Sequence, residues 1–490
     1  MTITEPTECS NSRRRNGLRR SAIGLFACVL TGGAGGMATV TGASAVTSAG
    51  TVAVAPAWKP AQAPVPPTAA ANPVTTVRQI TCTAPGKCVG VASFNSKSGF
   101  AVGVIEQLHG GSWTATSAPV PSGISSRQKV TLTSVSCATQ TSCGVSGFLD
   151  SPTSRRSELL TLVNGHWSAQ AAPLLPGTLP DSQTLSAISC RRPGSCVAVG
   201  RYQGGAHGYF QGLIEVQTDS GWRAVEAPLP ADATRTADPF GGVDWVSCTD
   251  AGQCTTVGAY VDNQGRRELF ADVLTGDRWH SSRLPLPDDA AANPLAYLGY
   301  VTCLSATRCL AVGNVNLANG AQHGLFEREI AGTWHAIVAP NPAGTPGGVD
   351  VNINEASCPT VSFCAATGNW KDNNGNNRGI LETLSGGRWH AAAAPAPAGD
   401  RTNLYMESVS CPVDQWCVAA GSTNFTGLLE MFDGGPWTVT SAPLPANGTF
   451  AVFGSTSVSC PSAQMCGAFG IYVRRGPPQT QQGLLETYHG

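Results

Sequence analysis

Three carboxylates stand close to paired cysteines that recur along the chain, where they could act as acids or bases. Glu355 lies three residues before the first cysteine of a pair, and Asp244 and Glu407 each lie four residues before one. Hydrolysis of a glycosidic bond needs one carboxylic acid to protonate the leaving group and a second carboxylate to activate water or attack the sugar. These residues raise the hypothesis of a carbohydrate-active enzyme, either a glycoside hydrolase or a polysaccharide lyase.

Other side chains in the same places could bind a ligand without reacting with it. Trp245 and Tyr300 each stand three residues before a first cysteine, and either could stack on a sugar ring. Arg78 and Asn354 stand one residue earlier in their repeats. Four further candidates lie in segments that differ from repeat to repeat: His207, Arg266, His323 and Asp372. The alternative is that the side chains beside the cysteines only fill a channel or pack between repeats.

Another set of acidic residues recurs too regularly to be a catalytic set. An acidic residue lies seven positions before a tryptophan in six repeats, and copies in this number indicate a structural or solvated role. The six are Glu106, Glu215, Asp272, Glu327, Glu382 and Glu430.

The sequence predicts no metal and no cofactor. Residues 372–377 are rich in Asp and Asn, as calcium loops are, but the bidentate Glu and the glycine spacing of such a loop are missing. An Asn-Gly hairpin turn explains that segment better. The chain also lacks the G-x-S-x-G, H-E-x-x-H and P-loop motifs.

These candidates are positioned by a unit of about 54 residues that is repeated eight times. Each unit has two cysteines six positions apart and four short apolar runs separated by turn residues. A fixed period of this size is typical of a propeller or a solenoid, and four strands per repeat are typical of a propeller blade. The strand with the tryptophan ends in a proline, so we expect it outermost, with the first strand beside a central channel.

Ring closure distinguishes a propeller from a solenoid here. The eighth unit stops at Gly490, before its tryptophan strand. That strand is present at the other end of the chain, where Trp58 precedes Ala63-Pro64-Val65-Pro66 with the spacing of the complete units. We therefore predict an all-β, eight-bladed propeller over residues 58–490, with four antiparallel strands per blade and residues 58–66 completing blade 8.

The cysteines predict disulfides within each repeat. Removal of a leader leaves sixteen cysteines, an even number, and in an exported chain such a set is typical of a disulfide framework. The two cysteines of a repeat flank one tight loop between the first and second strands. The predicted pairs are Cys82–Cys88, Cys137–Cys143, Cys190–Cys196, Cys248–Cys254, Cys303–Cys309, Cys358–Cys364, Cys411–Cys417 and Cys460–Cys466.

The N-terminus predicts export. Arginines at positions 13–20 precede an apolar stretch over residues 21–40, and Ala43-Ser44-Ala45 fits a cleavage site. Residues 1–45 are therefore interpreted as a signal peptide, with the general secretory route favoured over the twin-arginine route, and residues 46–57 as a low-complexity linker. No later stretch is long and apolar enough to span a bilayer. We expect a secreted or cell-wall-associated protein.

The composition excludes some partners. The net charge is −1 and only 12% of the residues are charged, which argues against nucleic acid and against an anionic membrane surface. We expect a monomer whose partner is a glycan or a protein.

The Ser-x-Ser-Cys, Cys-x-Ala-Val-Gly and Gly-Gly-x-Trp segments resemble those of secreted bacterial β-propeller repeat proteins, over residues 58–490. This resemblance implies the fold and no particular activity. Sialidase-like propellers have an Asp in the corresponding turns, which residues 385–389 lack. The docking motif of eight-bladed quinoprotein dehydrogenases is matched at residues 272–276, but Trp279 comes one residue early.

The sequence favours a non-catalytic recognition module whose variable loops bind a glycan or a protein on one rim of the ring. We expect the disulfide loops on the opposite rim. The alternatives are the carbohydrate-active enzyme with its site at the channel mouth and a structural envelope protein. The enzyme gains support if the three carboxylates converge on one open pocket, and loses it if they are separated or covered.

Overall fold

The computed structural model describes most of the chain after the predicted leader. The described residues are 57–122, 129–150, 155–179, 181–204, 208–234, 238–239, 241–346, 348–400, 403–477 and 479–490. The predicted signal peptide, nearly all of the predicted linker and His207 lie outside these residues.

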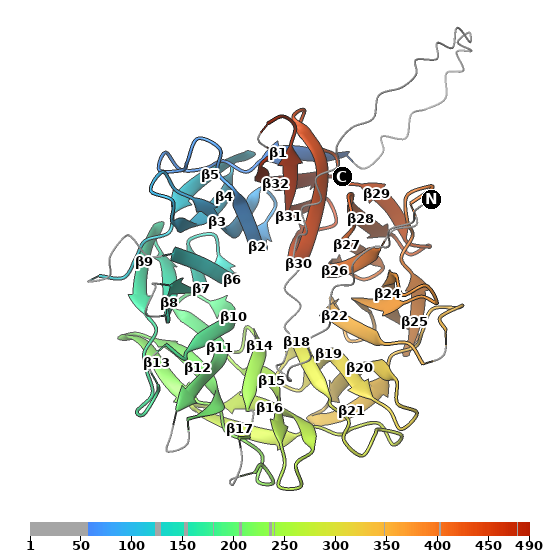
Figure 1. Ribbon diagram of the computed structural model, residues 1–490. Coiled ribbons are helices and arrows are strands. Elements are labelled where there is room, and N and C mark those ends of the chain that lie inside the picture. Colours follow the sequence, from blue (N-terminus) through green and yellow to red (C-terminus); the bar gives the residue numbers. More distant parts are fainter. Residues whose placement is uncertain are drawn as a thin grey trace, which may run out of the picture. The chain divides into compact units, whose positions relative to one another are not determined.

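The described chain forms eight four-stranded antiparallel sheets arranged as a ring around a central channel (Figure 1). The predicted eight-bladed propeller is confirmed. In blades 1 to 7 the first strand in sequence lies at the channel, and in all eight blades the tryptophan strand lies at the periphery, as predicted (Figure 1).

Blades 1 to 4 each use four consecutive strands. Blade 1 is β2 (Thr75–Ala84), β3 (Lys87–Asn95), β4 (Ala101–His109) and β5 (Ser112–Ser117). Blade 2 is β6 (Lys129–Thr139), β7 (Ser142–Asp150), β8 (Arg155–Val163) and β9 (His166–Ala171). Blade 3 is β10 (Thr184–Arg192), β11 (Ser195–Gly204), β12 (Tyr209–Thr218) and β13 (Gly221–Glu226). Blade 4 is β14 (Gly242–Cys248), β15 (Cys254–Val261), β16 (Arg267–Thr275) and β17 (Arg278–Arg283).

Blades 5 to 7 follow the same order, and blade 8 differs. Blade 5 is β18 (Tyr297–Ser305), β19 (Arg308–Asn316), β20 (Gln322–Ile330) and β21 (Thr333–Val338). Blade 6 is β22 (Val351–Ser357), β23 (Cys364–Lys371), β24 (Asn377–Ser385) and β25 (Arg388–Ala393). Blade 7 is β26 (Leu404–Val413), β27 (Trp416–Thr423), β28 (Gly427–Phe432) and β29 (Thr438–Ser441). Blade 8 is β30 (Gly448–Ser462), β31 (Met465–Arg474), β32 (Gln481–His489) and β1 (Ala57–Gln62).

The N-terminal strand closes the ring, as predicted. Strand β1 pairs antiparallel with β32, with Trp58 opposite Tyr488 and Pro60 opposite Glu486. The rings of Trp58 and Tyr488 lie 5.4 Å apart between centroids. The first and last described strands of the chain are thus neighbours in one sheet.

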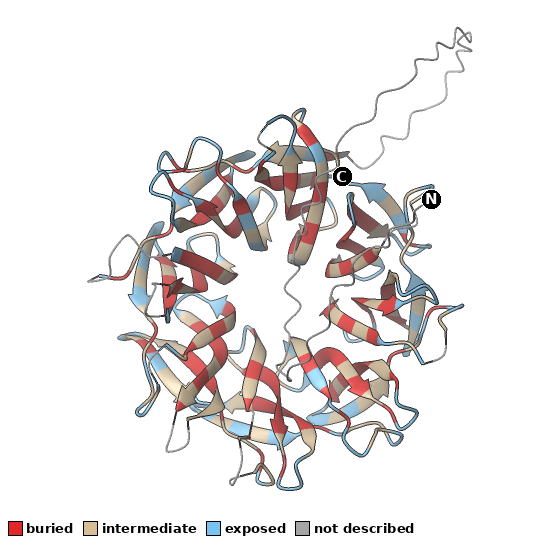
Figure 2. Ribbon diagram, viewed as in Figure 1, coloured by how far each residue is buried: buried red, intermediate tan, exposed pale blue. Residues whose placement is uncertain are grey.

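Burial follows the position of each strand within its blade. The second strands are almost continuously buried, as in β3, whereas the outer strands alternate between exposed and half-buried residues, as in β5 (Figure 2). This pattern arises because the second strand is covered on both faces by neighbouring blades, and the outer strand is only partly covered.

The tryptophans pack between neighbouring blades. Trp389 of blade 6 stacks on Phe326 of blade 5, with 3.9 Å between centroids and an 8° angle between planes. The indole N–H of Trp222 in blade 3 donates to Thr161 of blade 2 at 3.4 Å. Both tryptophans thus lie at the interface between two blades.

All eight predicted disulfides are present. Each joins the end of the first strand to the start of the second, with Cα–Cα distances of 3.9 to 4.2 Å. The disulfides all lie on one rim of the ring, hereafter the disulfide rim. The loops between second and third strands lie on the other rim, hereafter the loop rim. This arrangement confirms the predicted opposition of the two sets of loops.

The serine directly before the first cysteine links neighbouring blades. Within the described chain its hydroxyl accepts a hydrogen bond from the amide of the first cysteine in the next blade six times, at 2.9 to 3.0 Å. One example is Ser247, which accepts from the amide of Cys303. Thr81 and Thr302 stand in this place in the other two blades. The Ser-x-Ser-Cys motif is therefore an inter-blade hydrogen-bonding device.

A β-bulge lies four residues before the first cysteine in blades 1 to 7. The glycine four residues after the second cysteine faces this irregularity. A Cβ atom on Gly313 or Gly200 would clash with the carbonyl oxygen of Tyr297 or Thr184, respectively. A side chain at this place would therefore meet the backbone of the first strand, which explains why glycine recurs there.

Candidate functional site

The three carboxylates proposed for catalysis do not meet in an open pocket. Glu355 on β22 is only 6% exposed, and its Oε1 accepts a hydrogen bond from the Ser408 hydroxyl at 3.4 Å. Asp244 and Glu407 are bulge residues of β14 and β26 and are half-buried. None of the three is among the described residues that line the cavity at the channel.

Two loop candidates hold turns on the loop rim. The carboxylate of Asp372 accepts the amides of Asn374 and Asn376 and pairs with Arg378 at 2.7 Å. Arg266 makes the equivalent ion pair with the carboxylate of Asp262, also at 2.7 Å. Both contacts stabilise hairpin turns, and residues 372–377 form the turn that the Asn-Gly pattern predicts.

The remaining candidates lie apart from one another. Arg78 is an exposed bulge residue of β2, and the Asn354 side chain donates to the carbonyl of Met406 in the next blade at 2.9 Å. His323 on β20 is half-buried, and its Nε2 has no hydrogen-bond partner among the described residues. These three residues do not form one site.

Trp245 and Tyr300 do come together. They belong to the neighbouring blades 4 and 5, and their rings lie 4.7 Å apart between centroids at an angle of 35°. Burial and the nearby Glu355 carboxylate raise the pKa of Tyr300, whereas the Arg191 guanidinium acts to lower it. Arg191 and the aromatic pair therefore share one electrostatic environment.

These side chains line a cavity at the disulfide end of the central channel, hereafter the channel cavity. It has a volume of about 360 Å³ and is formed by the first strands of blades 1 to 5. Hydroxyls, one amide and backbone groups make up most of its lining. Its polar lining side chains include Gln79, Thr81, Thr83, Ser136, Ser189, Arg191, Ser247 and Thr302. The volume is within the range of small-ligand sites.

The residues three positions before the first cysteines form one level of the ring. At this level Gln79 accepts the amide of Val135, and Ser134 accepts that of Ile188, each in the next blade. In blades 4 and 5 the level holds Trp245 and Tyr300. Between blades 4 and 5 an aromatic contact thus stands where blades 1 to 3 have inter-blade hydrogen bonds, and both aromatic residues line the cavity.

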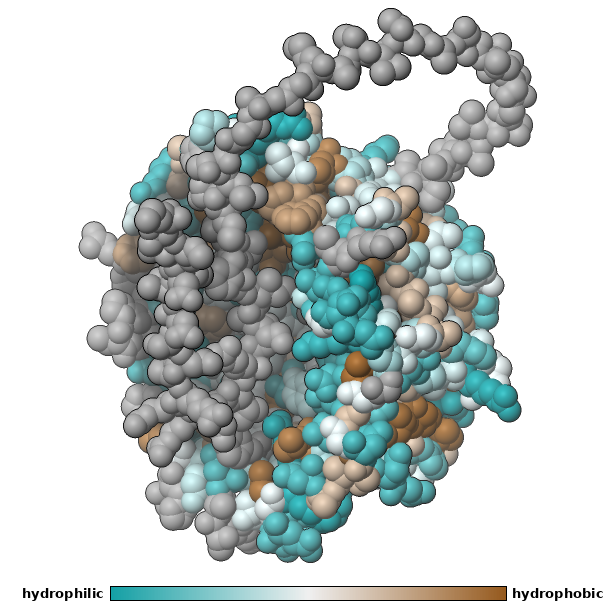
Figure 3. Space-filling view, turned by 45° about the vertical axis from the view of Figure 1, so that its right-hand side comes forward, coloured by the Kyte–Doolittle hydropathy of each residue, from teal (hydrophilic) through white to brown (hydrophobic). Residues whose placement is uncertain are grey.

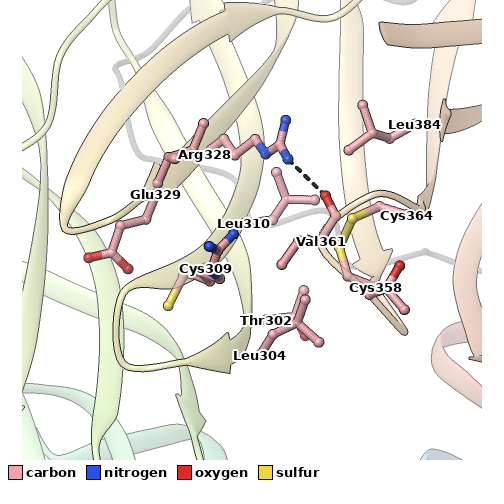
Figure 4. Close-up of a pocket in the computed structure, with 13 residues that line it drawn as sticks. Thr302, Leu304, Cys309, Leu310, Arg328, Glu329, Cys358, Val361, Cys364 and Leu384 are labelled. Atoms are coloured by element: carbon pink, nitrogen blue, oxygen red, sulfur yellow. Dashed lines mark hydrogen bonds between the residues drawn. A yellow bond between two sulfur atoms is a disulfide. The ribbon is translucent and has the colours of Figure 1, made fainter. Parts of the chain in front are cut away.

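A second hollow lies at the disulfide rim between blades 5 and 6 (Figure 4). The exposed side chains of Leu304 and Val361 flank it, and the Arg328 guanidinium donates to the Val361 carbonyl at 2.8 Å. Its volume of about 30 Å³ leaves room for water molecules but not for a sugar ring.

The outer surface offers no comparable feature among the described residues in view. Hydrophilic and hydrophobic side chains are interspersed on the face shown in Figure 3. Among the most exposed large apolar residues, Val163 belongs to blade 2 and Phe425 to blade 7. Single exposed apolar residues are ordinary on protein surfaces, so the channel cavity is the strongest candidate.

The recurrent acids are buried inside the blades. Each blade holds one carboxyl with an exposed fraction of 0%, and the structure adds Glu158 and Glu486 to the six predicted from the sequence. Burial raises the pKa of Glu106 to about 9 and that of Glu382 to about 8, so these groups hold a proton at neutral pH. The prediction of a structural role for these acids is therefore correct, and the alternative that they are exposed to solvent is wrong.

Comparisons with known proteins show a likeness in fold alone. No protein-family model and no curated protein matches the chain. A protein of unknown function from Dyadobacter fermentans is 9% identical over 73% of this chain and 93% of its own, with a TM-score of 0.38. Trypanosoma rangeli sialidase in complex with sialic acid is 11% identical over 88% of this chain and 59% of its own, with a TM-score of 0.38. The β-propeller domain of the Trilobed protease from Pyrococcus furiosus is 10% identical over 76% of this chain and 98% of its own, with a TM-score of 0.42.

Two further findings concern the described residues only. They form no helix that is long and apolar enough to cross a membrane. They also contain no group of three or more His, Cys, Asp or Glu side chains placed to hold a metal ion. The eight disulfides point to a protein of an oxidising, extracellular environment.

Arg191 is a lining residue that the sequence analysis missed. It directly follows Cys190, where other blades have Thr, Ala, Leu or Pro, so it is the one charged residue at that position. A comparison of the repeats at the position after the first cysteine would have revealed it.

Proposed function

We propose that this protein is an exported recognition module that binds a glycan in the channel cavity. The observation that supports this proposal is the pair formed by Trp245 and Tyr300 within an otherwise polar cavity. Sugar rings present apolar C–H faces that pack on aromatic rings, and hydroxyls that exchange hydrogen bonds with polar side chains. Both kinds of side chain are among the residues that line the cavity.

The position of the cavity changes the site expected from the sequence. The variable loops favoured the loop rim, whereas the aromatic pair lies toward the disulfide rim. Two loop-rim candidates, Arg266 and Asp372, are engaged in the turns that they stabilise. The proposed site therefore keeps Trp245 and Tyr300 from the original candidates and leaves the loop residues out.

The enzyme alternative receives less support. A hydrolase or lyase needs acid and base groups at the bound bond. Asp244, Glu355 and Glu407 are not among the residues that line the channel cavity. Binding without turnover is the function that this lining favours.

A glycan array followed by calorimetry tests the proposal. The purified disulfide-bonded protein is expected to bind a subset of oligosaccharides, and Trp245→Ala is expected to weaken binding about tenfold or more through loss of the stacking surface. Tyr297→Ala is the matched control, since Tyr297 lies on β18 with Tyr300 but at the loop rim.

The two variants discriminate between the two rims. Loss of binding in Tyr297→Ala with retention in Trp245→Ala would place the site on the loop rim and overturn the proposal. Thermal unfolding of both variants checks that a lost signal does not come from a lost fold. Turnover of any bound oligosaccharide would favour the enzyme alternative instead.

A further inference from the structure

In three blades a side chain of the preceding blade covers a backbone amide that faces the central channel. The amide two residues before the first cysteine receives an acceptor from the preceding blade in three places. Val135 donates to Gln79 Oε1 at 2.9 Å, Ile188 donates to Ser134 Oγ at 3.2 Å, and Val458 donates to Ser408 Oγ at 3.3 Å. These acceptors stand three residues before the first cysteine of their own blades.

The described residues show this bond in three of the eight blades, and for blades 4 and 5 the residue at the covering position has no side-chain acceptor. The residue that would cover the Val246 amide is Ala187, which has no polar side-chain atom. The residue that would cover the Val301 amide is Trp245, whose indole nitrogen is a donor and not an acceptor. Both valines line the channel cavity.

The strand register directs these two amides away from their own sheets. The Cα atoms of Cys248 and Cys254 lie 4.0 Å apart, as do those of Cys303 and Cys309, and such close pairs in an antiparallel ladder are not hydrogen-bonded to each other. Residues two positions along a strand have the same orientation. The N–H groups of Val246 and Val301 therefore point to the open, channel-facing edges of β14 and β18.

The residues that line the cavity carry charge of one sign, whereas the nearby Glu355 carboxylate, which raises the pKa of Tyr300, is not part of the lining. Among the described residues that line it, Arg191 is the only one with a formal charge. Its side chain is exposed, and it lies near enough to Tyr300 to influence the tyrosine electrostatically. A guanidinium and two uncovered amides are all hydrogen-bond donors, and a carboxylate is an acceptor at both oxygens.

We infer that the glycan bound in the channel cavity is an acidic saccharide, whose carboxylate is held by the Val246 and Val301 amides and the Arg191 guanidinium. The inference rests on the proposed function, because the aromatic pair and hydroxyls supply the contacts to the rest of the sugar. A neutral sugar offers these donors only hydroxyl and ring oxygens, which accept weaker hydrogen bonds than a carboxylate and carry no charge to pair with the guanidinium.

The test compares acidic oligosaccharides with neutral forms of the same chains. The full disulfide-bonded protein is applied to an array of oligogalacturonate, glucuronoxylan and alginate oligosaccharides, each beside its carboxyl-reduced form. We expect at least one acidic chain to bind about tenfold or more tighter than its reduced form. We also expect this preference to fall as salt is raised.

Two variants test the donors themselves. Arg191→Gln should reduce the preference for the acidic form about tenfold, whereas Arg192→Gln, at the next position, should leave it unchanged. Ala187→Ser should supply the missing hydroxyl to the Val246 amide, as Ser134 does for Ile188, and so weaken acidic binding while the melting temperature holds or rises.

The outcomes separate this inference from the proposed function. Equal binding of acidic and reduced chains, with loss of both in Trp245→Ala, would keep the glycan site and overturn the carboxylate assignment. An acidic preference that is unchanged in both Arg191→Gln and Ala187→Ser would overturn it too. Failure of every saccharide to bind in a manner that depends on Trp245 would overturn both.

Discussion

The ring of buried carboxyls should make the protein more stable in mild acid than in mild alkali. Glu382 in blade 6 has an exposed fraction of 0%, and burial raises its pKa from 4.5 to about 8. Between these two values the folded state keeps the proton that the unfolded state loses. The contribution of this group is therefore fully present below pH 4.5 and is lost as the pH rises toward 8.

The magnitude follows from the linkage between proton binding and folding. Each such carboxyl lowers the free energy of unfolding by up to about 1.4 kcal/mol per pH unit within this window. The isosteric change Glu382→Gln removes one carboxyl and cannot ionise. Relative to the native protein, the variant should therefore gain up to about 4 kcal/mol of stability between pH 5 and pH 8.

The assay is urea unfolding followed by tryptophan fluorescence at pH 5, 6, 7 and 8, with the disulfides intact. Asp433→Asn is the control, because Asp433 is exposed in a turn of blade 7 and lies outside the buried ring. The native protein should lose stability steadily over this range, and Glu382→Gln should lose it less steeply. A variant that is destabilised equally at pH 5 and pH 8 would refute the reasoning, because it would mean that the native carboxyl is not a buried acid that keeps its proton.

Three other predictions concern the scaffold. Ser247→Ala removes the hydroxyl that accepts the Cys303 amide and should lower the free energy of unfolding by about 1 kcal/mol, measured by urea unfolding. Deletion of residues 57–62 leaves β32 as an unpaired edge and should cause association at low protein concentration, visible by light scattering. Asp372→Ala removes the acceptor of two turn amides and should speed hydrogen exchange in residues 372–377, with glycan binding in the channel cavity unchanged.

The sequence was sufficient for the fold because the signals for it are local and repeated. The cysteine spacing sets the first hairpin of each blade, and the displaced Trp58 strand indicates closure. The six buried acids were found by the same periodicity. Their protonation was not, because it depends on the neighbouring blade that covers each carboxyl.

The site was harder to predict because the bulges change the direction of side chains. Asp244, Glu407, Arg78 and Asn354 are all bulge residues, and the alternation of side chains along a regular strand does not hold there. Position in the sequence placed them beside Trp245 and Tyr300, but the register separates them from the cavity lining. The covering of the Val246 amide likewise depends on Ala187, a residue of the preceding blade.

The pairing of β1 with β32 also determines when the ring can close during synthesis. The hydrogen bond between Gln62 and Gln482 connects positions 420 residues apart. At about 5–20 residues per second of synthesis, the earliest strand waits for roughly 20 to 80 seconds before its partner exists. During that time the ring of the nascent chain is open, and the strands at its two ends have unpaired edges. A translation product that ends before β32 would keep the edge of β1 unpaired.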